Sequence, residues 1–132
     1  MNPFFLAASV LTVILGVAHS ILGERLIFIP LRTQKPSGGI RPVLRNGHLG
    51  IIWATWHLTT ALGFSLAGVF WLMALGLPKT PHQQHYGLII SVGFLTCSFL
   101  VGYGTKGRHP GWIVLAMSAL LTMAGSFTGV TI

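Results

Sequence analysis

The fold of this chain is decided by the stretch FFLAASVLTVILGVAHSIL, residues 4–22, which contains no Asp, Glu, Lys or Arg. About 20 consecutive apolar residues are enough to cross the hydrocarbon core of a bilayer as a helix. Asn2 and Pro3 stand directly before the stretch and are typical of an N-cap followed by the first helical residue. We therefore expect a membrane-spanning helix from residue 3 to residue 29, ended by Pro30.

Three further apolar segments follow, separated by proline, glycine and basic residues. We expect spans at 47–76, 81–104 and 110–131, and within the four spans only Glu24 and Arg25 carry a charge. The sequence thus predicts a single integral membrane domain over residues 1–132, an all-α bundle of four transmembrane helices.

The composition excludes the other common classes of protein. Of the 132 residues, 52% are hydrophobic and 7% charged, with a mean hydropathy of +0.77, whereas a soluble domain carries about 25% charged residues. Disordered chains are poor in apolar residues, and a disulfide scaffold needs more than Cys97, the sole cysteine. The net charge of +7 does not indicate nucleic acid, because the basic residues lie between apolar segments, where an anionic membrane surface attracts them.

The basic residues are divided unevenly among the loops, and this division predicts the orientation. Cytoplasmic loops of membrane proteins carry an excess of Lys and Arg. Seven of the eight basic residues lie in the first and third loops or their flanks, and one lies in the second. Both termini are therefore expected on the extracytoplasmic side. The seven are Arg25, Arg32, Lys35, Arg41, Arg45, Lys106 and Arg108, and the eighth is Lys79.

Polar residues at membrane depth are costly and mark candidate sites. His19 and His57 each stand ten residues from an expected inner helix end, which is about 15 Å at the helical rise. Helices adjacent in sequence are usually neighbours, and two imidazoles at matched depth are a geometry that haem or metal ligation uses. With Glu24 nearby, the sequence predicts a polar pocket in the inner leaflet. Its expected further members are Trp53, Thr60, Thr96, Cys97 and Ser118.

Other interpretations of these residues stay open. His19 and His57 are either ligands, two neutral histidines that hydrogen-bond across helices, or members of a proton relay or a quinone contact. Glu24 either titrates inside a pocket or forms an ion pair with Arg45 or Arg108 at the interface.

The remaining histidines have weaker claims. His48 and His109 are possible additional metal ligands, but their places at helix ends favour a role as caps. His82 and His85 fit the solvated end of a helix. The ligand motifs HExxH, CxxC and ExxH do not occur.

The segments HSILGER at 19–25 and WHLTT at 56–60 resemble a group of small bacterial four-helix membrane proteins. In that group an HSxLGER segment ends the first span and a WHLTT segment lies in the second. The group brings no assigned activity. The resemblance implies a bacterial cytoplasmic (inner) membrane and directs attention to His19, Glu24 and His57.

The leading functional hypothesis is a small membrane protein that binds a haem, a transition metal ion or a quinone in a pocket formed by His19, His57 and Glu24. One alternative is a proton-coupled homo-oligomeric transporter that uses Glu24. Another is a structural or assembly subunit of a larger membrane complex. Catalysis is the least supported class, because the chain has one acid and one isolated thiol. The expected partners are the lipid bilayer and further copies or a membrane complex, and no nucleic acid.

Overall fold

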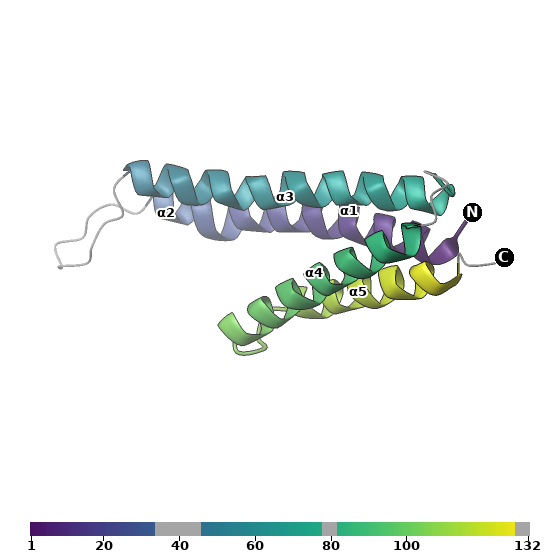
Figure 1. The fold of residues 1–132 in the computed structure, drawn as a ribbon. Coiled ribbons are helices and arrows are strands. Elements are labelled where there is room, and N and C mark those ends of the chain that lie inside the picture. Colours follow the sequence, from purple (N-terminus) through teal and green to yellow (C-terminus); the bar gives the residue numbers. More distant parts are fainter. Residues whose placement is uncertain (34–45, 78–81, 129–132) are drawn as a thin grey trace.

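A computed structural model describes residues 1–33, 46–77 and 82–128, and within these ranges the chain is helical and contains no strand (Figure 1). Four stretches are long and apolar enough to cross a membrane, namely Pro3–Thr33, Gly47–Ala74, Gln84–Gly104 and Gly111–Thr128. The predicted all-α fold with four candidate spans is thereby confirmed. The elements are α1 (Pro3–Gly23), η1 (Glu24–Phe28), α2 (Ile29–Thr33), α3 (Asn46–Ala74), α4 (Gln83–Gly104) and α5 (Gly111–Thr128).

The predicted end of the first span at residue 29 is wrong, because the helix continues through Pro30 to Thr33. In a regular α-helix the ring of Pro30 would meet the carbonyl four residues earlier, and the proline has no N–H to donate. The π-helical turn η1 avoids this conflict, since the N–H of Ile29 donates to the carbonyl of Glu24, five residues back. The wider turn lets the helix pass the proline.

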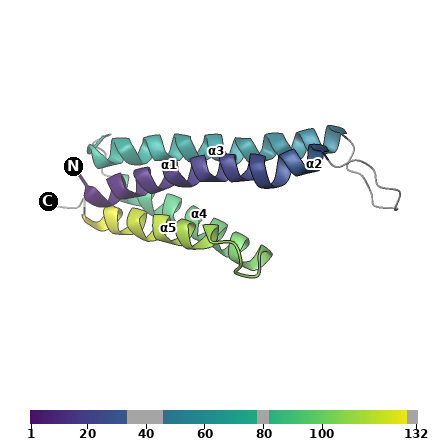
Figure 2. The ribbon, with the colours of Figure 1, turned by 180° about the vertical axis from the view of Figure 1, so that it is seen from behind.

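The helices form two antiparallel hairpins, α1 with α3 and α4 with α5, and α1 also packs against α5. The first residues of the chain and the end of α5 lie at one end, called here the terminal end, where the hairpins are close together. Toward the opposite end, called here the divergent end, the hairpins separate (Figures 1 and 2). The apolar core accordingly gathers near the start of α1 and the end of α3. It consists of Phe5, Ala8, Phe70, Met73, Ala74, Phe94 and Ala119.

Asn2 ties three helices together at the terminal end. Its side-chain oxygen accepts from the N–H groups of Phe4 and Phe5 at 3.0 and 3.4 Å, which confirms the predicted N-cap. Its backbone N–H donates to the carbonyl of Ala74 in α3 at 2.8 Å. Its side-chain nitrogen donates to the carbonyl of Gly125 in α5 at 3.0 Å. The terminal end is thus joined by polar contacts as well as by the core.

Small residues and serines bring the helices close, as expected where lipid supplies no hydrophobic drive between helices. A Cβ atom built on Gly16 would lie 2.7 Å from the ring of Phe64. Ser9 donates across to the carbonyl of Ala67 at 2.9 Å, and Ser91 donates to that of Ala119 at 2.8 Å.

Every basic residue that the structure describes lies toward the divergent end. Arg25 and Arg32 lie in η1 and α2, and Lys106 and Arg108 follow α4. The remaining basic residues lie outside the described ranges. These basic residues thus gather at one end of the helices, as their division among the loops predicts. Which side of the membrane that end faces stays a prediction.

Candidate functional site

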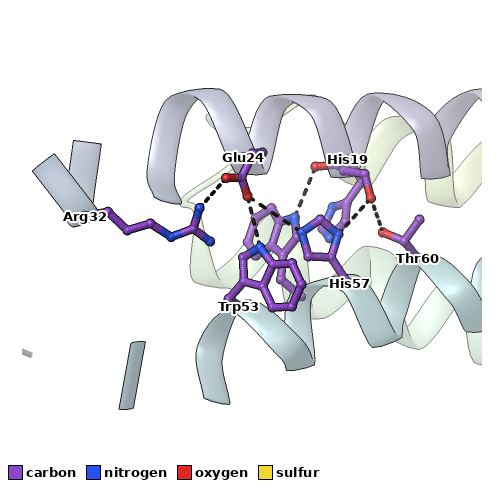
Figure 3. Close-up of polar contacts among 8 residues, drawn as sticks. His19, Glu24, Arg32, Trp53, His57 and Thr60 are labelled. Atoms are coloured by element: carbon purple, nitrogen blue, oxygen red, sulfur yellow. Dashed lines mark hydrogen bonds and ion pairs between the residues drawn. The ribbon is translucent and has the colours of Figure 1, made fainter. Parts of the chain in front are cut away.

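The site starts from Glu24, the first residue of η1, whose carboxylate is engaged on both oxygens (Figure 3). Arg32 in α2 donates to Oε1 at 2.5 Å and forms an ion pair with it. The indole N–H of Trp53 in α3 donates to Oε2 at 3.0 Å. Glu24 therefore forms an ion pair, as one interpretation of the sequence expected, but its partner is Arg32. The sequence analysis named Arg45 or Arg108 instead, and Arg45 lies outside the described residues.

The π-helical turn explains how Arg32 reaches Glu24. Residues eight apart in a regular α-helix are separated by about 80° around the axis. A π turn acts as one inserted residue, so the separation falls to that of residues seven apart, about 20°. Arg32 is thereby brought to the same side as Glu24. Sequence reasoning missed this contact because it ended the helix before Pro30.

His57 in α3 connects the carboxylate to a chain of hydroxyl groups. Its Nε2 atom lies 3.9 Å from Oε2 of Glu24, and its Nδ1 atom lies 3.1 Å from the hydroxyl of Ser20 in α1. Ser20 donates to the hydroxyl of Thr60 at 3.1 Å. With Ser20 donating to Thr60, the Ser20 oxygen can accept from Nδ1–H of a neutral His57. In that tautomer Nε2 presents a lone pair to the carboxylate, and the roles of the two ring nitrogens depend on the tautomer.

His19 is held differently, although His57 and His109 lie within electrostatic range of it. Its ring stacks on the indole of Trp56, with centroids 4.1 Å apart and planes inclined by 8°. The indole N–H of Trp56 donates to the backbone carbonyl of His19 at 3.1 Å. The Nε2 atom of His19 is buried without a hydrogen-bond partner. The backbone of Trp56 is a polar group within reach of the His19 ring.

The two histidines expected at matched depth on neighbouring helices therefore contact different groups. His57 contacts Glu24, Ser20 and the edge of Trp53, whose ring centroid is 4.6 Å away. His19 contacts Trp56. Among the described residues, no three His, Cys, Asp or Glu side chains gather in a way that can hold a metal ion.

The other predicted site residues lie at helix ends. His48 is exposed in the first turns of α3. His109 is exposed before α5, and its Nδ1 atom accepts from the N–H of Gly111 at 3.0 Å, which is the contact of a cap.

The predicted pocket does not extend to the second hairpin. Thr96 and Cys97 are exposed on α4, and Ser118 is buried with its hydroxyl bonded to the carbonyl of Val114. The expectation that these three residues line the polar pocket is wrong. Within the described residues the polar group comes from α1, η1, α2 and α3. The reason is the divergence of the hairpins at this level.

Two shallow hollows border the site. One, of about 250 Å³, is lined by Arg32, Leu49, Gly50 and Trp53. The other, of about 300 Å³, lies beside His19 and is lined by His19, Ile51, Ile52, Thr55, Trp56 and Thr59.

Comparisons of the chain with protein-family models, curated proteins and solved structures find no significant match.

Proposed function

We propose that this chain is a small proton-coupled membrane transporter and that Glu24 and His57 together form its proton-binding site. One observation carries the proposal: Nε2 of His57 faces Oε2 of Glu24 at 3.9 Å, while Nδ1 is engaged with Ser20. In the Nδ1–H tautomer of a neutral His57, both facing atoms present lone pairs and repel each other. One added proton converts the contact into an attractive, charge-assisted pair.

The position of the pair suits proton exchange. The side chains of Glu24 and Arg32 are 33% and 44% exposed, whereas Thr60, at the other end of the hydroxyl chain, is buried. The pair thus stands between an accessible surface and the helix interface. Ionisable groups in such places mark ion and proton pathways in membrane proteins.

The charges around the pair are balanced for a single proton. Arg32 approaches Glu24 from α2 and compensates its charge, and Trp53 and His57 approach from α3. The group is neutral while His57 is neutral and carries one positive charge after protonation. His19 lies on the same helix as Glu24, and His109 lies before α5. His19 and His109 belong to the electrostatic surroundings of the Glu24–His57 pair, because His19 lies within electrostatic range of His57 and of His109.

Ligation of haem or a metal ion by His19, His57 and Glu24 has less support. Metal sites need three or four ligands that point to one place, and haem ligation by two histidines needs both rings to do so. His19 is stacked on Trp56, and His57 is bonded to Ser20. Glu24 already accepts from Arg32 and Trp53.

The expected assembly is a homo-oligomer in a bacterial inner membrane. Between 22% and 33% of the most apolar window of each span is buried within the chain. Most of that surface is available to lipid and to further copies, and an apolar surface of this extent is covered in a bilayer.

Infrared spectroscopy tests the proton-binding site directly, because Glu24 is the only acidic side chain in the chain. The pH-dependent carboxylate band of the protein in liposomes is recorded, and the spectrum of Glu24→Gln is subtracted to remove the C-terminal carboxylate. We expect the pH midpoint of this band to change in His57→Gln and to stay constant in His85→Gln. An identical midpoint in the native chain, His57→Gln and His85→Gln would show that Glu24 and His57 do not share a proton.

Proton flux tests the transport part. Protein is reconstituted in liposomes that contain a pH-sensitive dye, and a potassium diffusion potential drives protons inward. We expect flux above that of empty liposomes, reduced to that background in Glu24→Gln and His57→Gln and retained in His85→Gln. Undiminished flux in Glu24→Gln contradicts the proposal.

A further inference from the structure

One side of α3 is covered near the terminal end and uncovered toward the divergent end. Phe70 belongs to the buried core and meets Phe94 of α4, with ring centroids 5.9 Å apart. At about 100° per residue, Ile52 and Thr59 lie within about 20° of Phe70 around the helix axis, and Thr55 lies within about 60°. The same stripe therefore continues into the half where the α4–α5 hairpin has moved away (Figure 1).

This uncovered half of the stripe forms the wall of the hollow of about 300 Å³ described above. The stacked rings of His19 and Trp56 form an aromatic wall of the hollow, and Ile51 and Ile52 make it mainly apolar. The hydroxyls of Thr55 and Thr59 donate back to carbonyls of their own helix at 2.9 and 3.1 Å. Their oxygens keep lone pairs that can accept hydrogen bonds.

His19 adds a polar atom that has no partner. Its Nε2 atom is buried without a hydrogen bond, and leaving such a group unsatisfied is costly. A buried polar atom of this kind calls for an explanation such as a ligand. Because the atom is covered, a ligand in the hollow reaches it only after a neighbouring side chain rotates.

The size of the hollow is that of a small-molecule site. Its volume of about 300 Å³ lies at the lower end of small-molecule pockets, which begin at about 300 Å³. Since it opens between membrane spans, its occupant comes from the lipid phase.

We propose that this hollow binds the ring of a lipid-soluble quinone or quinol, with the ring against the His19–Trp56 wall and the ring oxygens near Thr55, Thr59 and His19. A planar ring packs against the aromatic wall. The few polar atoms among apolar side chains fix its orientation, and an isoprenoid or alkyl tail extends into the bilayer. This site uses the side of α3 marked by Thr55 and Thr59 and does not rest on the Glu24–His57 pair.

Quenching of tryptophan fluorescence by decylubiquinone, a short-tailed quinone, tests the site, because Trp56 lies in its wall. Protein in detergent is titrated with the quinone, in parallel with Thr59→Phe, which fills the hollow. The matched control is Thr96→Phe, since Thr96 is also exposed and also donates to the carbonyl four residues back, at 2.9 Å, but lies on α4. Circular dichroism and gel filtration establish that each variant is folded.

We expect saturable quenching in the native chain and in Thr96→Phe and at least tenfold weaker binding in Thr59→Phe. His19→Leu, which removes both the wall and the unpaired nitrogen, should weaken binding to a similar degree. Quenching that is equal in Thr59→Phe and the native chain, or that never saturates, overturns the proposal because it reports partitioning of the quinone into detergent.

Glu24→Gln separates this proposal from the proton-coupled function. We expect it to bind decylubiquinone as the native chain does, even where its proton flux is lost. Loss of saturable quenching in Glu24→Gln together with its retention in Thr59→Phe would place the ring on the other side of α3 and refute the site proposed here.

Discussion

Gly23 is the position where a single methyl group tests the architecture most sharply. A Cβ atom at Gly23 would overlap the indole of Trp56, the side chain that stacks on His19 and donates to its carbonyl at 3.1 Å. Gly23→Ala therefore has to displace the indole or push α1 and α3 apart. Either displacement also disturbs the surroundings of His19.

The expected cost follows from the contacts that move. Overpacking of a tight interface costs about 1–3 kcal/mol. The lost hydrogen bond adds about 0.5–1.5 kcal/mol, and the disturbed stacking adds about 0.5–1.5 kcal/mol. These terms overlap because the indole moves as one unit, so we expect a total of about 2–4 kcal/mol.

The matched control is Gly68→Ala, because Gly68 lies inside α3 and nothing lies within 4 Å of a Cβ built on it. Separated helices stay helical in the membrane, so the intrinsic preference of alanine for helix contributes little in either variant. We expect Gly68→Ala to stay within about 0.5 kcal/mol of the native chain, as surface changes do.

The measurement is the free energy of unfolding, from titration of each protein in mixed micelles with a denaturing detergent and circular dichroism as the readout. If Gly23→Ala and Gly68→Ala unfold within 0.5 kcal/mol of each other, the close approach of α1 to Trp56 is refuted. The arrangement of His19 and the adjacent hollow would fall with it.

Three further outcomes are expected in the same titration. Asn2→Ala removes the N-cap and its links to α3 and α5, and we expect a loss of about 1–2 kcal/mol; no loss would contradict the closure of the terminal end. Ser91→Ala removes a hydrogen bond between α4 and α5 and should cost about 0.6 kcal/mol, whereas Ser65→Ala, on a hydroxyl that donates within its own helix, should cost nothing measurable. Lys106 has a φ angle of 52°, which glycine adopts more readily than other residues, so Lys106→Gly should stabilise the chain by about 0.5–1 kcal/mol. Lys106→Ala should not stabilise it, and equal effects of the two substitutions would show that the gain does not come from the backbone conformation.

Some contacts of the site were accessible from the sequence and others were not. Trp53 and Thr60 were expected beside His57 from helical spacing, and the structure places Trp53 against its ring and Thr60 at the end of its hydroxyl chain. Ser20 carried no distinct signal, because a serine in an apolar helix is usual at any helix interface. Arg32 was assigned to a loop, since a proline inside a helical pattern ordinarily marks its end.

The sequence by itself determined the class of the protein. Apolar length, proline and glycine punctuation and the scarcity of charge are local properties, and each span satisfies its backbone hydrogen bonds internally whatever surrounds it. The same local reasoning singled out the one acid and the histidines at membrane depth. For these features no neighbouring helix had to be known.

Only the tertiary structure decided which of those residues meet. The π-helical turn at Glu24 rotates Arg32 into contact, the close approach at Gly23 seats Trp56 against His19, and His57 is bonded to Ser20. Such pairings depend on the rotation of each helix about its axis, which in a membrane is set by packing between helices and not by hydrophobicity, because lipid and apolar side chains are nearly equivalent surroundings. For the same reason the divergence of the hairpins, and with it the hollow beside His19, has no counterpart in the hydropathy pattern.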